Sequence, residues 1–491
     1  MTIPTRMVWL TVLFGLALCG CSDQSSDTPG TTLESRPNIL LILGDDMGVE
    51  TLASYRLGST TPATATLDDL ARQGVQFNNF WSQPVCSPTR ATIITGRYGF
   101  RTGVGRPLTA GGPAPEPPAK PAWAPYEVPG TGGGMGFGGS TDGLTLSYGL
   151  PGNEFTLPRA LKSGAGPAYA TAAIGKWHLG DAENGWTEHP NLVGFDHYEA
   201  VLRGIDSYFS WNKVVDGDYV GTTHYAATDR VDAAVEWISD RGDSPWFMWL
   251  GFTLPHTPLH LPPEELWQSD HSELDPNADP TENPLPYFHA MIEAMDSEIG
   301  RLLASIDPAV LDNTYVIFLG DNGTTSTTVT EPFQPGRAKG SVYQGGVNVP
   351  LIIKGPRVAR GRSSDALINS TDLYATILEM AGLDARELTP SHVTLDSISL
   401  LPNLLEPDSP SRRQWVYVDV FSGNFAGVEG ADYAMRDERY KLLRRDGVLE
   451  FYDLMTDPFE HINLLDGTLS APQEERYQWL QARVTALRGS E

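Results

Sequence analysis

Residues 38–43, NILLIL, followed at once by Gly44-Asp45-Asp46, decide the fold class of this chain. A continuous run of branched apolar residues is typical of a parallel strand that is buried on both faces. A second run, Tyr315–Leu319, is followed in the same way by Gly320-Asp321-Asn322-Gly323. The carboxyl ends of parallel strands form the edge of an open α/β sheet at which ligands bind. If the two strands are parallel, their four polar side chains share that edge.

The segments around these two runs alternate between helix and strand patterns. Residues 66–74 have the spacing of a short amphipathic helix that ends at a glycine, and the strand-like residues 75–77 follow. This order predicts an α/β fold with a large, mostly parallel mixed sheet sandwiched by helices, and a smaller C-terminal antiparallel sheet plus a helix. Further expected strands are 169–174, 246–252, 349–353, 415–420, 439–444 and 448–452, and further expected helices are 157–162, 231–238, 291–306, 372–381 and 472–487.

Length and net charge limit the classes of protein to which this chain can belong. With 491 residues, the chain is longer than one ordinary domain. Its formal net charge of -27 argues against nucleic-acid binding, because no block of Lys and Arg offers the counterion release on which phosphate binding depends. Any anionic substrate must therefore be held by local positive charges.

The N-terminus has the pattern of a targeting segment. The apolar run 7–18 is too short to span a bilayer, and Leu18-Cys19-Gly20-Cys21 resembles a bacterial lipobox. We expect residues 1–20 to be a lipoprotein signal peptide, Cys21 to carry lipid and residues 21–35 to be a polar tether; the alternative is an ordinary secretory signal. The protein is then exported and lipid-anchored to a bacterial membrane, facing the periplasm or lying on the cell surface.

Cys86 lies at an expected helix start, in the stretch CSPTRATIITGRY of residues 86–98, and Arg90 follows one helical turn later. If Cys21 is acylated, Cys86 has no partner for an intramolecular disulfide. An exported protein that keeps one unpaired thiol either buries it as an inert side chain or uses it as a reactive one, and composition alone leaves both open.

Other expected strand ends also carry polar groups. Lys176 and His178 stand in GKWHLG (175–180), His256 stands in the turn PHTP (255–258), and Lys339 opens a later loop. Two carboxylates about 4 Å apart repel by about 4 kcal/mol at an effective dielectric of 20, so a third aspartate calls for a hard, oxygen-preferring divalent cation. Each Asp-Gly pair taken alone also fits an ordinary turn. A metal centre ringed by cations is the arrangement that hydrolysis of an anionic ester needs.

These motifs resemble the type I sulfatases. CSPTRATIITGR matches the CxPxR and TGR signature of that family, GKWHLG matches its second signature, and the other motifs occur in the family's order over nearly all of residues 36–491. The resemblance implies an alkaline-phosphatase-like fold, and that Cys86 is oxidised by a formylglycine-generating enzyme to Cα-formylglycine. The hydrated aldehyde then attacks the sulfur, and its second hydroxyl releases sulfate.

The resemblance also implies roles for individual residues, although an isolated His or Lys is more often structural. Calcium would be bound by Asp45, Asp46, Asp321, Asn322 and the modified Cys86. The remaining catalytic groups would be Arg90 and His178, which orient the diol, Lys176, which binds the sulfate, and His256 and Lys339, which assist the leaving group.

Three departures from the family pattern stand out. The loop after Lys339 has Gln344 and Asn348 where the family usually has a glutamate and an arginine, and Gly320 replaces a frequent serine. A buried Glu-to-Arg arrangement is therefore missing, which leaves open how Lys339 is positioned and which leaving groups are accepted.

Residues 106–152 are dense in Gly and Pro and fit no regular element. Aromatic side chains in this loop could line a substrate cleft, or the loop could be a simple surface excursion; these side chains are Trp123, Tyr126, Phe137 and Tyr148.

The sequence thus predicts a catalytic domain over residues 36–405 and a C-terminal α+β subdomain over residues 406–491. The expected activity is hydrolysis of O-sulfate esters to an alcohol and inorganic sulfate, with a sulfated carbohydrate as the expected substrate. The alternatives are a phosphoester or phosphonate ester hydrolase on the same fold, or a calcium-bearing lipoprotein that binds sulfated glycans without cleaving them.

Overall fold

A computed structural model describes residues 36–108, 114–127, 149–421 and 430–489. They belong to one compact unit that begins at Arg36. The predicted signal peptide, Cys21 and the tether lie outside the described residues. Within the described part of the chain, no helix is both long enough and apolar enough to cross a membrane.

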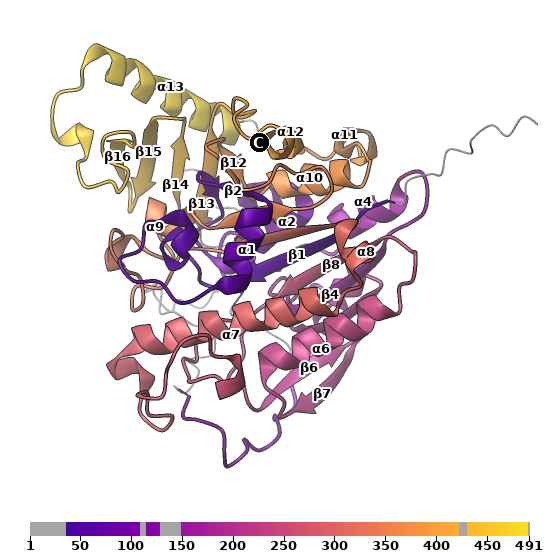
Figure 1. Cartoon of the computed structure of the whole chain (residues 1–491). Helices are drawn as coiled ribbons and strands as arrows, with labels where there is room; N and C mark the ends of the chain where they lie inside the picture. The colour runs from indigo at the N-terminus through magenta and orange to yellow at the C-terminus, as the bar shows by residue number, and fades with distance from the viewer. Residues whose placement is uncertain (1–35, 109–113, 128–148, 422–429, 490–491) are drawn as a thin grey trace, which may run out of the picture. The chain divides into compact units, whose positions relative to one another are not determined.

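The centre of the fold is a ten-stranded sheet in the order β11-β2-β10-β9-β1-β8-β4-β5-β6-β7 (Figure 1). Its middle five strands are all parallel, and Gly44 at the end of β1 is in register with Gly320 at the end of β9. The predicted mixed, mostly parallel sheet is therefore confirmed, and the two Asp-bearing strands do end at one edge. The five parallel strands are β9 (Thr314–Gly320), β1 (Asn38–Gly44), β8 (Trp246–Gly251), β4 (Ala170–Lys176) and β5 (His197–Val201).

The outer strands make the sheet mixed. Strand β10 is antiparallel to both β9 and β2, and at the opposite end β6 and β7 form an antiparallel hairpin on β5. The hairpin, which was not predicted, turns through Asp216 and Gly217, both at positive φ, and an Asp-Gly pair is a typical sequence signal of such a turn. The bounds are β2 (Val75–Phe77), β10 (Leu351–Lys354), β11 (Arg362–Ser364), β6 (Trp211–Val215) and β7 (Asp218–Thr222).

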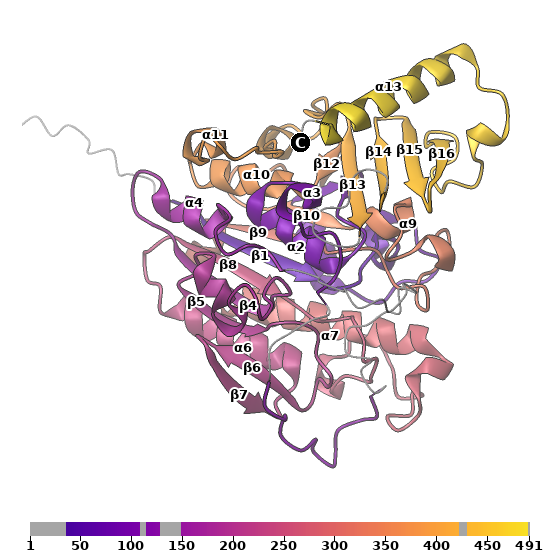
Figure 2. The same ribbon diagram turned by 180° about the vertical axis from the view of Figure 1, so that it is seen from behind.

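Helices cover both faces of the sheet (Figures 1 and 2). Ile39 and Leu41 of β1 pack into one hydrophobic cluster, whereas Leu40 and Ile42 pack into another, as the twofold alternation of a strand requires. The first cluster includes side chains of α2 (Cys86–Thr95), α4 (Leu157–Ser163) and α10 (Asp372–Met380), and the second includes side chains of α1 (Ala65–Gln73), α6 (Ala226–Ser239) and α7 (Pro284–Ser305).

A four-stranded antiparallel sheet with one long helix forms the C-terminal part of the fold. The predicted strands and helix are present, and β14 was missed. The elements are β13 (Val416–Phe421), β14 (Ala431–Arg436), β15 (Tyr440–Arg445), β16 (Val448–Asp453) and α13 (Ala471–Arg488). Shorter elements are β3 (Phe80–Trp81), β12 (Ile368–Asn369), α3 (Gly99–Thr102), α5 (His189–Leu192), α8 (Pro308–Asp312), α9 (Gln344–Val347), α11 (Ala385–Leu388) and α12 (Leu401–Leu405).

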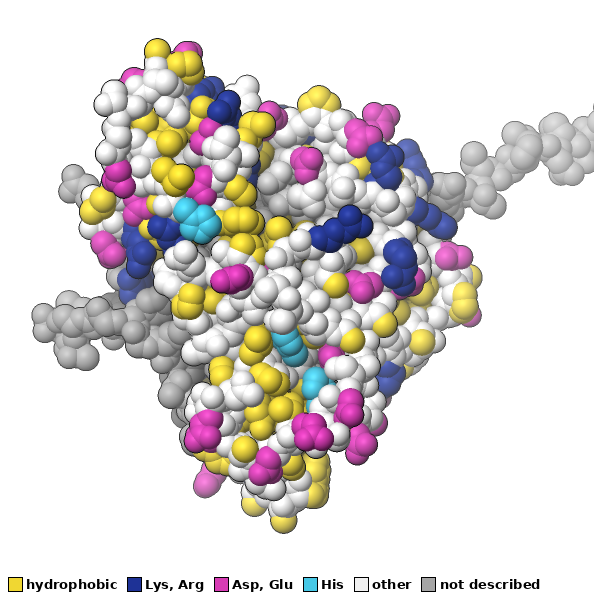
Figure 3. All heavy atoms as spheres, turned by 60° about the vertical axis from the view of Figure 1, so that its left-hand side comes forward, with side chains coloured by type: hydrophobic (Ala, Val, Ile, Leu, Met, Phe, Trp, Pro, Cys, Tyr) yellow, Lys and Arg dark blue, Asp and Glu magenta, His cyan; other side chains and the backbone are white. Residues whose placement is uncertain are grey.

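The acidic excess of the chain is dispersed rather than concentrated on the face shown in Figure 3. Asp and Glu side chains are scattered over that face, whereas Lys and Arg side chains lie mostly over its upper half. The electrostatics of the site therefore depend on the side chains that line it.

Candidate active site

The structure brings all the predicted site residues together at the carboxyl edge of the parallel strands. Helix α2 lies beside this edge and begins at Cys86, because Val85 before it is extended and Cys86 is the first helical residue. The strand ends supply the rest: Asp45 and Asp46 follow β1, Asp321 and Asn322 follow β9, Lys176 and His178 end and follow β4, and His256 follows β8, while Lys339 comes from the loop before α9.

The two Asp-bearing turns are joined by hydrogen bonds. Asp46 adopts a left-handed backbone conformation (φ 73°), and its N–H donates to Oδ1 of Asp321 at 3.3 Å. Nδ2 of Asn322 donates to Oδ1 of Asp46 at 2.8 Å. The two turns approach so closely that a Cβ on Gly320 would lie 2.2 Å from the carbonyl oxygen of Met47, which explains the glycine at this position.

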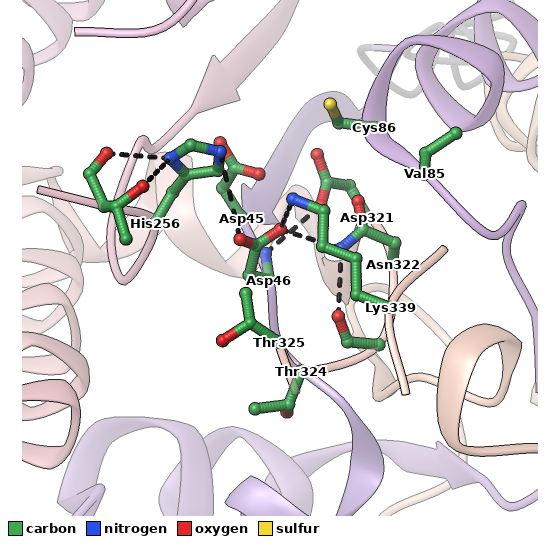
Figure 4. A network of polar contacts seen from close by, with 12 residues as sticks. Asp45, Asp46, Val85, Cys86, His256, Asp321, Asn322, Thr324, Thr325 and Lys339 are labelled. Atoms are coloured by element: carbon green, nitrogen blue, oxygen red, sulfur yellow. Dashed lines mark hydrogen bonds and ion pairs between the residues drawn. The ribbon is translucent and has the colours of Figure 1, made fainter. Parts of the chain in front are cut away.

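Three cations neutralise the acidic cluster, and Figure 4 shows one of them, Lys339, beside Asp46. Nζ of Lys176 lies 2.5 Å from Oδ2 of Asp45, and Nζ of Lys339 contacts Oδ1 of Asp46. Burial alone would raise the pKa of Asp45, but the positive charges, of which Lys176 has the largest effect, hold that pKa well below its usual range. The carboxylate is therefore ionised.

The third cation is Arg90, which is completely buried. Its Nη2 and Nε lie 2.8 and 3.1 Å from Oδ2 of Asp321, and its Nη1 donates to the carbonyl oxygen of Lys176 at 2.6 Å. Arg90 thus ties the start of α2 to the ends of β9 and β4. It does not line the open cavity, so its contact with any ligand would run through the residues that it positions.

The oxygen-rich cluster fits a divalent cation. Oδ1 of Asp45 and Oδ1 of Asn322 are buried and have no hydrogen-bond partner among the described residues. One ligand atom each from Asp45, Cys86 and Asp321 lies within 4.8 Å of the other two. Burial and the nearby Asp45 raise the pKa of Asp321 to about 6, which is the direction expected of carboxylates crowded together without a cation. Hard oxygen donors of this kind suit calcium or magnesium.

Cys86 is a buried, neutral thiol whose hydrogen bond is fixed. Its Sγ lies 3.2 Å from Nδ1 of His178, and Nε2 of His178 lies 3.1 Å from the carbonyl oxygen of Leu108. A carbonyl can only accept, so Nε2 carries the proton of the neutral imidazole and Nδ1 accepts from the thiol. Burial raises the pKa of Cys86, and burial with the Lys176 charge lowers the pKa of His178 far below its ordinary value. A protonated thiol is a poor nucleophile.

The cavity in front of Cys86 has a volume of about 230 Å³. Its wall combines two lysines, two histidines and four hydroxyl side chains with Asp46 and several apolar residues, so it can hold an anionic group beside the lysines and hydroxyl groups of a ligand beside the threonines. Its lining includes Cys86, Lys176, His178, His256, Lys339, Thr257, Thr325, Ser326 and Thr327.

His256 lines this cavity, and one of its ring nitrogens makes no close hydrogen bond among the described residues. Its Nδ1 lies 2.8 Å from the carbonyl oxygen of Thr257 and therefore carries the proton, while Nε2 lies 3.9 Å from Oδ2 of Asp46. Burial lowers the pKa of His256, so the imidazole is neutral at pH 7. Nε2 can thus take a proton and return it.

Lys339 is held by the backbone on both sides of the cavity. Its N–H donates to the carbonyl oxygen of Thr324 at 2.9 Å, and the N–H of Gly340 donates to that of Pro84 at 2.8 Å. Burial opposes the charge, but the surrounding acidic groups, of which Asp46 has the largest effect, together outweigh burial and raise the pKa of Lys339 above its usual value, so the ammonium is charged.

The side chain of Gln344 accepts from Trp81, and its backbone contacts a buried ion pair of the C-terminal part of the chain. Oε1 of Gln344 accepts from Nε1 of Trp81 at 2.9 Å, and the N–H of Gln344 donates to Oε2 of Glu460 at 2.6 Å. Glu460 in turn pairs with Lys441 at 2.5 Å, and both side chains are almost fully buried. Sequence reasoning missed Glu460 and Lys441, because nothing in the sequence joins residues that lie about a hundred positions from the loop.

The described part of the Gly/Pro-rich loop does not line the cavity with its aromatic side chains. Trp123 is 68% exposed and packs edge-on against Phe209, and Tyr126 is also exposed. Phe137 and Tyr148 lie outside the described residues.

Comparison with known proteins places this site in a family. The profile described as "Sulfatase" matches residues 37–383, and the one described as "N-sulphoglucosamine sulphohydrolase, C-terminal" matches residues 338–488. The chain belongs to the sulfatase family. It is a type I sulfatase in the alkaline phosphatase superfamily, and this sulfatase is a sulfuric ester hydrolase.

Individual relatives agree with this assignment. The sulfatase is 26% identical to arylsulfatase G of Rattus norvegicus, over 93% of this chain and 86% of the relative. It is 30% identical to N-acetylgalactosamine-6-sulfatase of Homo sapiens, over 75% of this chain and 66% of that relative. Among solved structures, the PsFucS1 sulfatase from Pseudoalteromonas sp. superposes with a TM-score of 0.67 at 24% identity, covering 92% of this chain and 91% of the other, which shows a common fold.

Proposed function

We propose that this sulfatase hydrolyses O-sulfate esters of a carbohydrate, with a formylglycine formed from Cys86 as its nucleophile and with bound calcium. The observation that carries the proposal is the state of Cys86. It lies at the wall of a cavity lined by Lys176 and Lys339, yet it is a buried thiol with a raised pKa. A thiol of this kind is unsuited to attack sulfur itself, whereas a hydrated aldehyde at the same position supplies hydroxyl groups directed at the same space.

The donor set of the acidic cluster supports calcium. Asp45, Asp46, Asp321 and Asn322 would hold the ion, together with the side chain at position 86. When bound, calcium supplies a fixed positive charge that polarises a sulfate oxygen and stabilises charge in the transition state.

The cavity residues have separate tasks in this reaction. Lys176 and Lys339 present ammonium groups that bind the sulfate oxygens and stabilise the charge that develops on them. His178 accepts a hydrogen bond at Nδ1 from the side chain at position 86 and so orients it. Nε2 of His256 carries no proton in the neutral ring, so it would take up the proton that the attacking hydroxyl at position 86 gives up and pass it to the leaving alcohol, while Lys339 stabilises the same oxygen. Arg90 holds Asp321 and the end of β4 in place.

A sulfated sugar is the substrate class that we propose. The human relative is named for its action on N-acetylgalactosamine-6-sulfate. The outer wall of the cavity carries the hydroxyl groups of Thr257, Thr325, Ser326 and Thr327, which can donate to and accept from sugar hydroxyls.

Mass spectrometry and turnover test the proposal together. The peptide that contains Cys86, from protein expressed in a host with a formylglycine-generating enzyme, should have the mass of formylglycine. The same protein should release sulfate from 4-nitrocatechol sulfate and from sulfated sugars. Faster turnover of 4-nitrophenyl phosphate than of the sulfate ester would instead identify a phosphoester hydrolase. An inactive protein that carries formylglycine and calcium would identify a sulfated-glycan-binding protein.

We also propose that the protein is exported and anchored to a bacterial membrane through lipid on Cys21. The lipobox-like Leu18-Cys19-Gly20-Cys21 supports this. In cells that express the full chain, the protein should partition into the detergent phase of a Triton X-114 extract. The Cys21→Ser variant should move to the aqueous phase, and equal partitioning of the two would contradict the anchor.

A further inference from the structure

A second cavity, of about 170 Å³, lies next to the catalytic cavity, and Gly204 lines both. We call it the Trp186 cavity. Its wall comes from the segment between β4 and α5, from the chain after β5, from the β6–β7 hairpin and from the described part of the Gly/Pro-rich loop, and it includes Pro115, Trp186, Arg203, Asp206, Asn212 and Tyr219.

The two cavities are neighbours because one extended segment separates them. After β5 ends at Val201, the chain continues to pair with the segment that carries the catalytic groups. The N–H of Trp177 donates to the carbonyl oxygen of Val201 at 2.9 Å, and that of His178 donates to Leu202 at 3.1 Å. The chain leaves this pairing at Arg203 and Gly204, so one side of the turn faces the catalytic cavity and the other faces the Trp186 cavity.

The side chains of the Trp186 cavity combine aromatic rings with planar polar groups. Nε1 of Trp186 donates to the hydroxyl of Tyr219 at 2.8 Å, which fixes the two rings as one wall, and the guanidinium of Arg203 lies 5.3 Å from the centre of the Trp186 ring. Nδ2 of Asn212 donates to the carbonyl oxygen of Pro115 at 2.7 Å and joins the loop to the hairpin. Rings that accept the C–H face of a pyranose, beside charged and amide groups for its hydroxyls, are suited to an uncharged sugar.

Gly204 keeps the passage between the cavities open. A Cβ at this position would meet no described atom within 4 Å, and the backbone of Gly204 is not in the left-handed region. Neither packing nor backbone conformation therefore demands glycine here. The consequence of the missing side chain is space at the point where the two cavities meet.

We propose that the Trp186 cavity is a subsite for the sugar next to the sulfated one, so that the substrate is a sulfated oligosaccharide or polysaccharide rather than a monosaccharide. This subsite rests on the proposed sulfatase function, and it adds the residues that would bind the neighbouring sugar. Each cavity alone is smaller than the about 300 Å³ at which ordinary small-molecule pockets begin, and the two together exceed it.

The binding test uses the Cys86→Ala protein, which has neither a thiol nor a hydroxyl at position 86 and should not turn a substrate over. Monosaccharide and tetrasaccharide pairs prepared from chondroitin sulfate, ulvan and carrageenan are titrated by calorimetry. For at least one pair, the tetrasaccharide should bind at least about tenfold more tightly, and adding Trp186→Ala should remove about that factor, which corresponds to one stacked ring. Trp186→Phe, which keeps a ring, should retain part of the preference.

Two further variants make the test independent of a folding defect. Gly204→Leu adds a side chain to the open passage without removing any wall, and it should also abolish the tetrasaccharide preference. Trp479→Ala, which removes a half-buried indole from α13, should leave the preference as it was.

Equal affinity of monosaccharide and tetrasaccharide in every pair, or a preference that survives both Trp186→Ala and Gly204→Leu, would overturn the subsite. The ratio of kcat/KM for the same pairs with active enzyme should follow the binding ratio. Failure of the active enzyme to hydrolyse 4-nitrocatechol sulfate would count against the proposed function, and the binding measurement would still decide on the subsite.

Discussion

Sγ of Cys86 lies 3.2 Å from Nδ1 of His178, a nitrogen that can only accept, because Nε2 of the same ring donates to the carbonyl oxygen of Leu108. The first residue of α2 is thus aimed at a fixed acceptor at the end of β4. This contact orients any hydroxyl or thiol at position 86 relative to the cations of the cavity. Burial keeps both groups neutral, because it raises the pKa of Cys86 and, with the Lys176 charge, lowers the pKa of His178.

Cys86→Ala should abolish turnover while leaving the fold intact. Alanine removes the only precursor of the aldehyde and a single buried sulfur atom, so we expect kcat on 4-nitrocatechol sulfate to fall by at least about 1,000-fold. The melting temperature, followed by circular dichroism, should change by only a few degrees. Activity near that of the wild type would refute the assignment of the nucleophile.

Calcium should raise both stability and activity. An ion that binds only the folded state, and whose free concentration is about 100 times its Kd, adds about 2.7 kcal/mol to the free energy of unfolding. Adding a chelator should therefore lower the melting temperature and the rate of sulfate release, and calcium in excess should restore both. Asp45→Asn, which weakens the donor set, should reduce the calcium-dependent shift in melting temperature. Identical melting curves with chelator and with calcium would contradict a calcium site.

His256→Ala should affect poor leaving groups most. Proton transfer from a positioned imidazole typically contributes about 10²- to 10⁴-fold when the leaving alcohol is basic, and little when it is already a stable anion. We expect kcat/KM for a sugar sulfate to fall by such a factor and kcat/KM for 4-nitrocatechol sulfate to fall far less. His392→Ala, at an exposed histidine, serves as the matched control. Equal losses on both substrates would argue for a structural role of His256.

The parallel core and the site edge were predictable because their signals are local. Continuous apolar runs such as residues 38–43 report burial on both faces, and the Asp that follows each run marks the strand end. The hairpin of β6 and β7 was not predicted, because its strands are half exposed and have only a weak apolar pattern. The pair Asp216-Gly217 is nevertheless a typical signal of its turn.

Contacts that join distant segments were not predictable in the same way. The sequence predicted that Arg90 lies near the diol. The structure shows in addition that Arg90 does not line the cavity and bridges Asp321 and the end of β4. The motif departure at Gln344 left the position of Lys339 open, and the structure shows that backbone contacts with Thr324 and Pro84 hold this segment, which no spacing rule predicts.

The buried pair of Lys441 and Glu460 should matter to stability. Lys441→Met leaves the Glu460 carboxylate buried without its partner, and removal of one member of such a pair typically costs about 3–5 kcal/mol of unfolding free energy. The double variant Lys441→Met/Glu460→Gln should recover much of that loss, because the amide still accepts from the N–H of Gln344. Urea denaturation measures each value.

Lys162→Met provides the control for this pair. Lys162 makes a partly exposed ion pair with Asp196 at 2.8 Å, and exposed pairs contribute less than about 1 kcal/mol. If Lys441→Met cost no more than Lys162→Met, the buried pair would have no special part in anchoring the loop of Lys339.

His189 should make the enzyme less stable in acid. Nδ1 of His189 accepts from Nε1 of Trp177 at 2.9 Å and Nε2 donates to the carbonyl oxygen of Leu150 at 2.7 Å, so the ring is fixed in its neutral form beneath the segment that carries Lys176 and His178. Burial lowers the pKa of His189 to about 4. Between pH 6.5 and 4 the unfolded chain therefore binds a proton that the folded chain does not, and the free energy of unfolding should fall by about 3 kcal/mol as the pH falls through this window.

The variant His189→Gln isolates this contribution. Glutamine can accept from Trp177 through its oxygen and donate to Leu150 through its nitrogen, but it does not titrate. Its free energy of unfolding should therefore decline less steeply than that of the wild type between pH 6.5 and 4, whereas His392→Gln should follow the wild type because His392 is exposed. Other buried histidines, such as His260 with a pKa of about 4, contribute equally to all three proteins and cancel in the comparison. Parallel stability curves for His189→Gln and the wild type would mean that His189 takes up its proton in the folded state without cost.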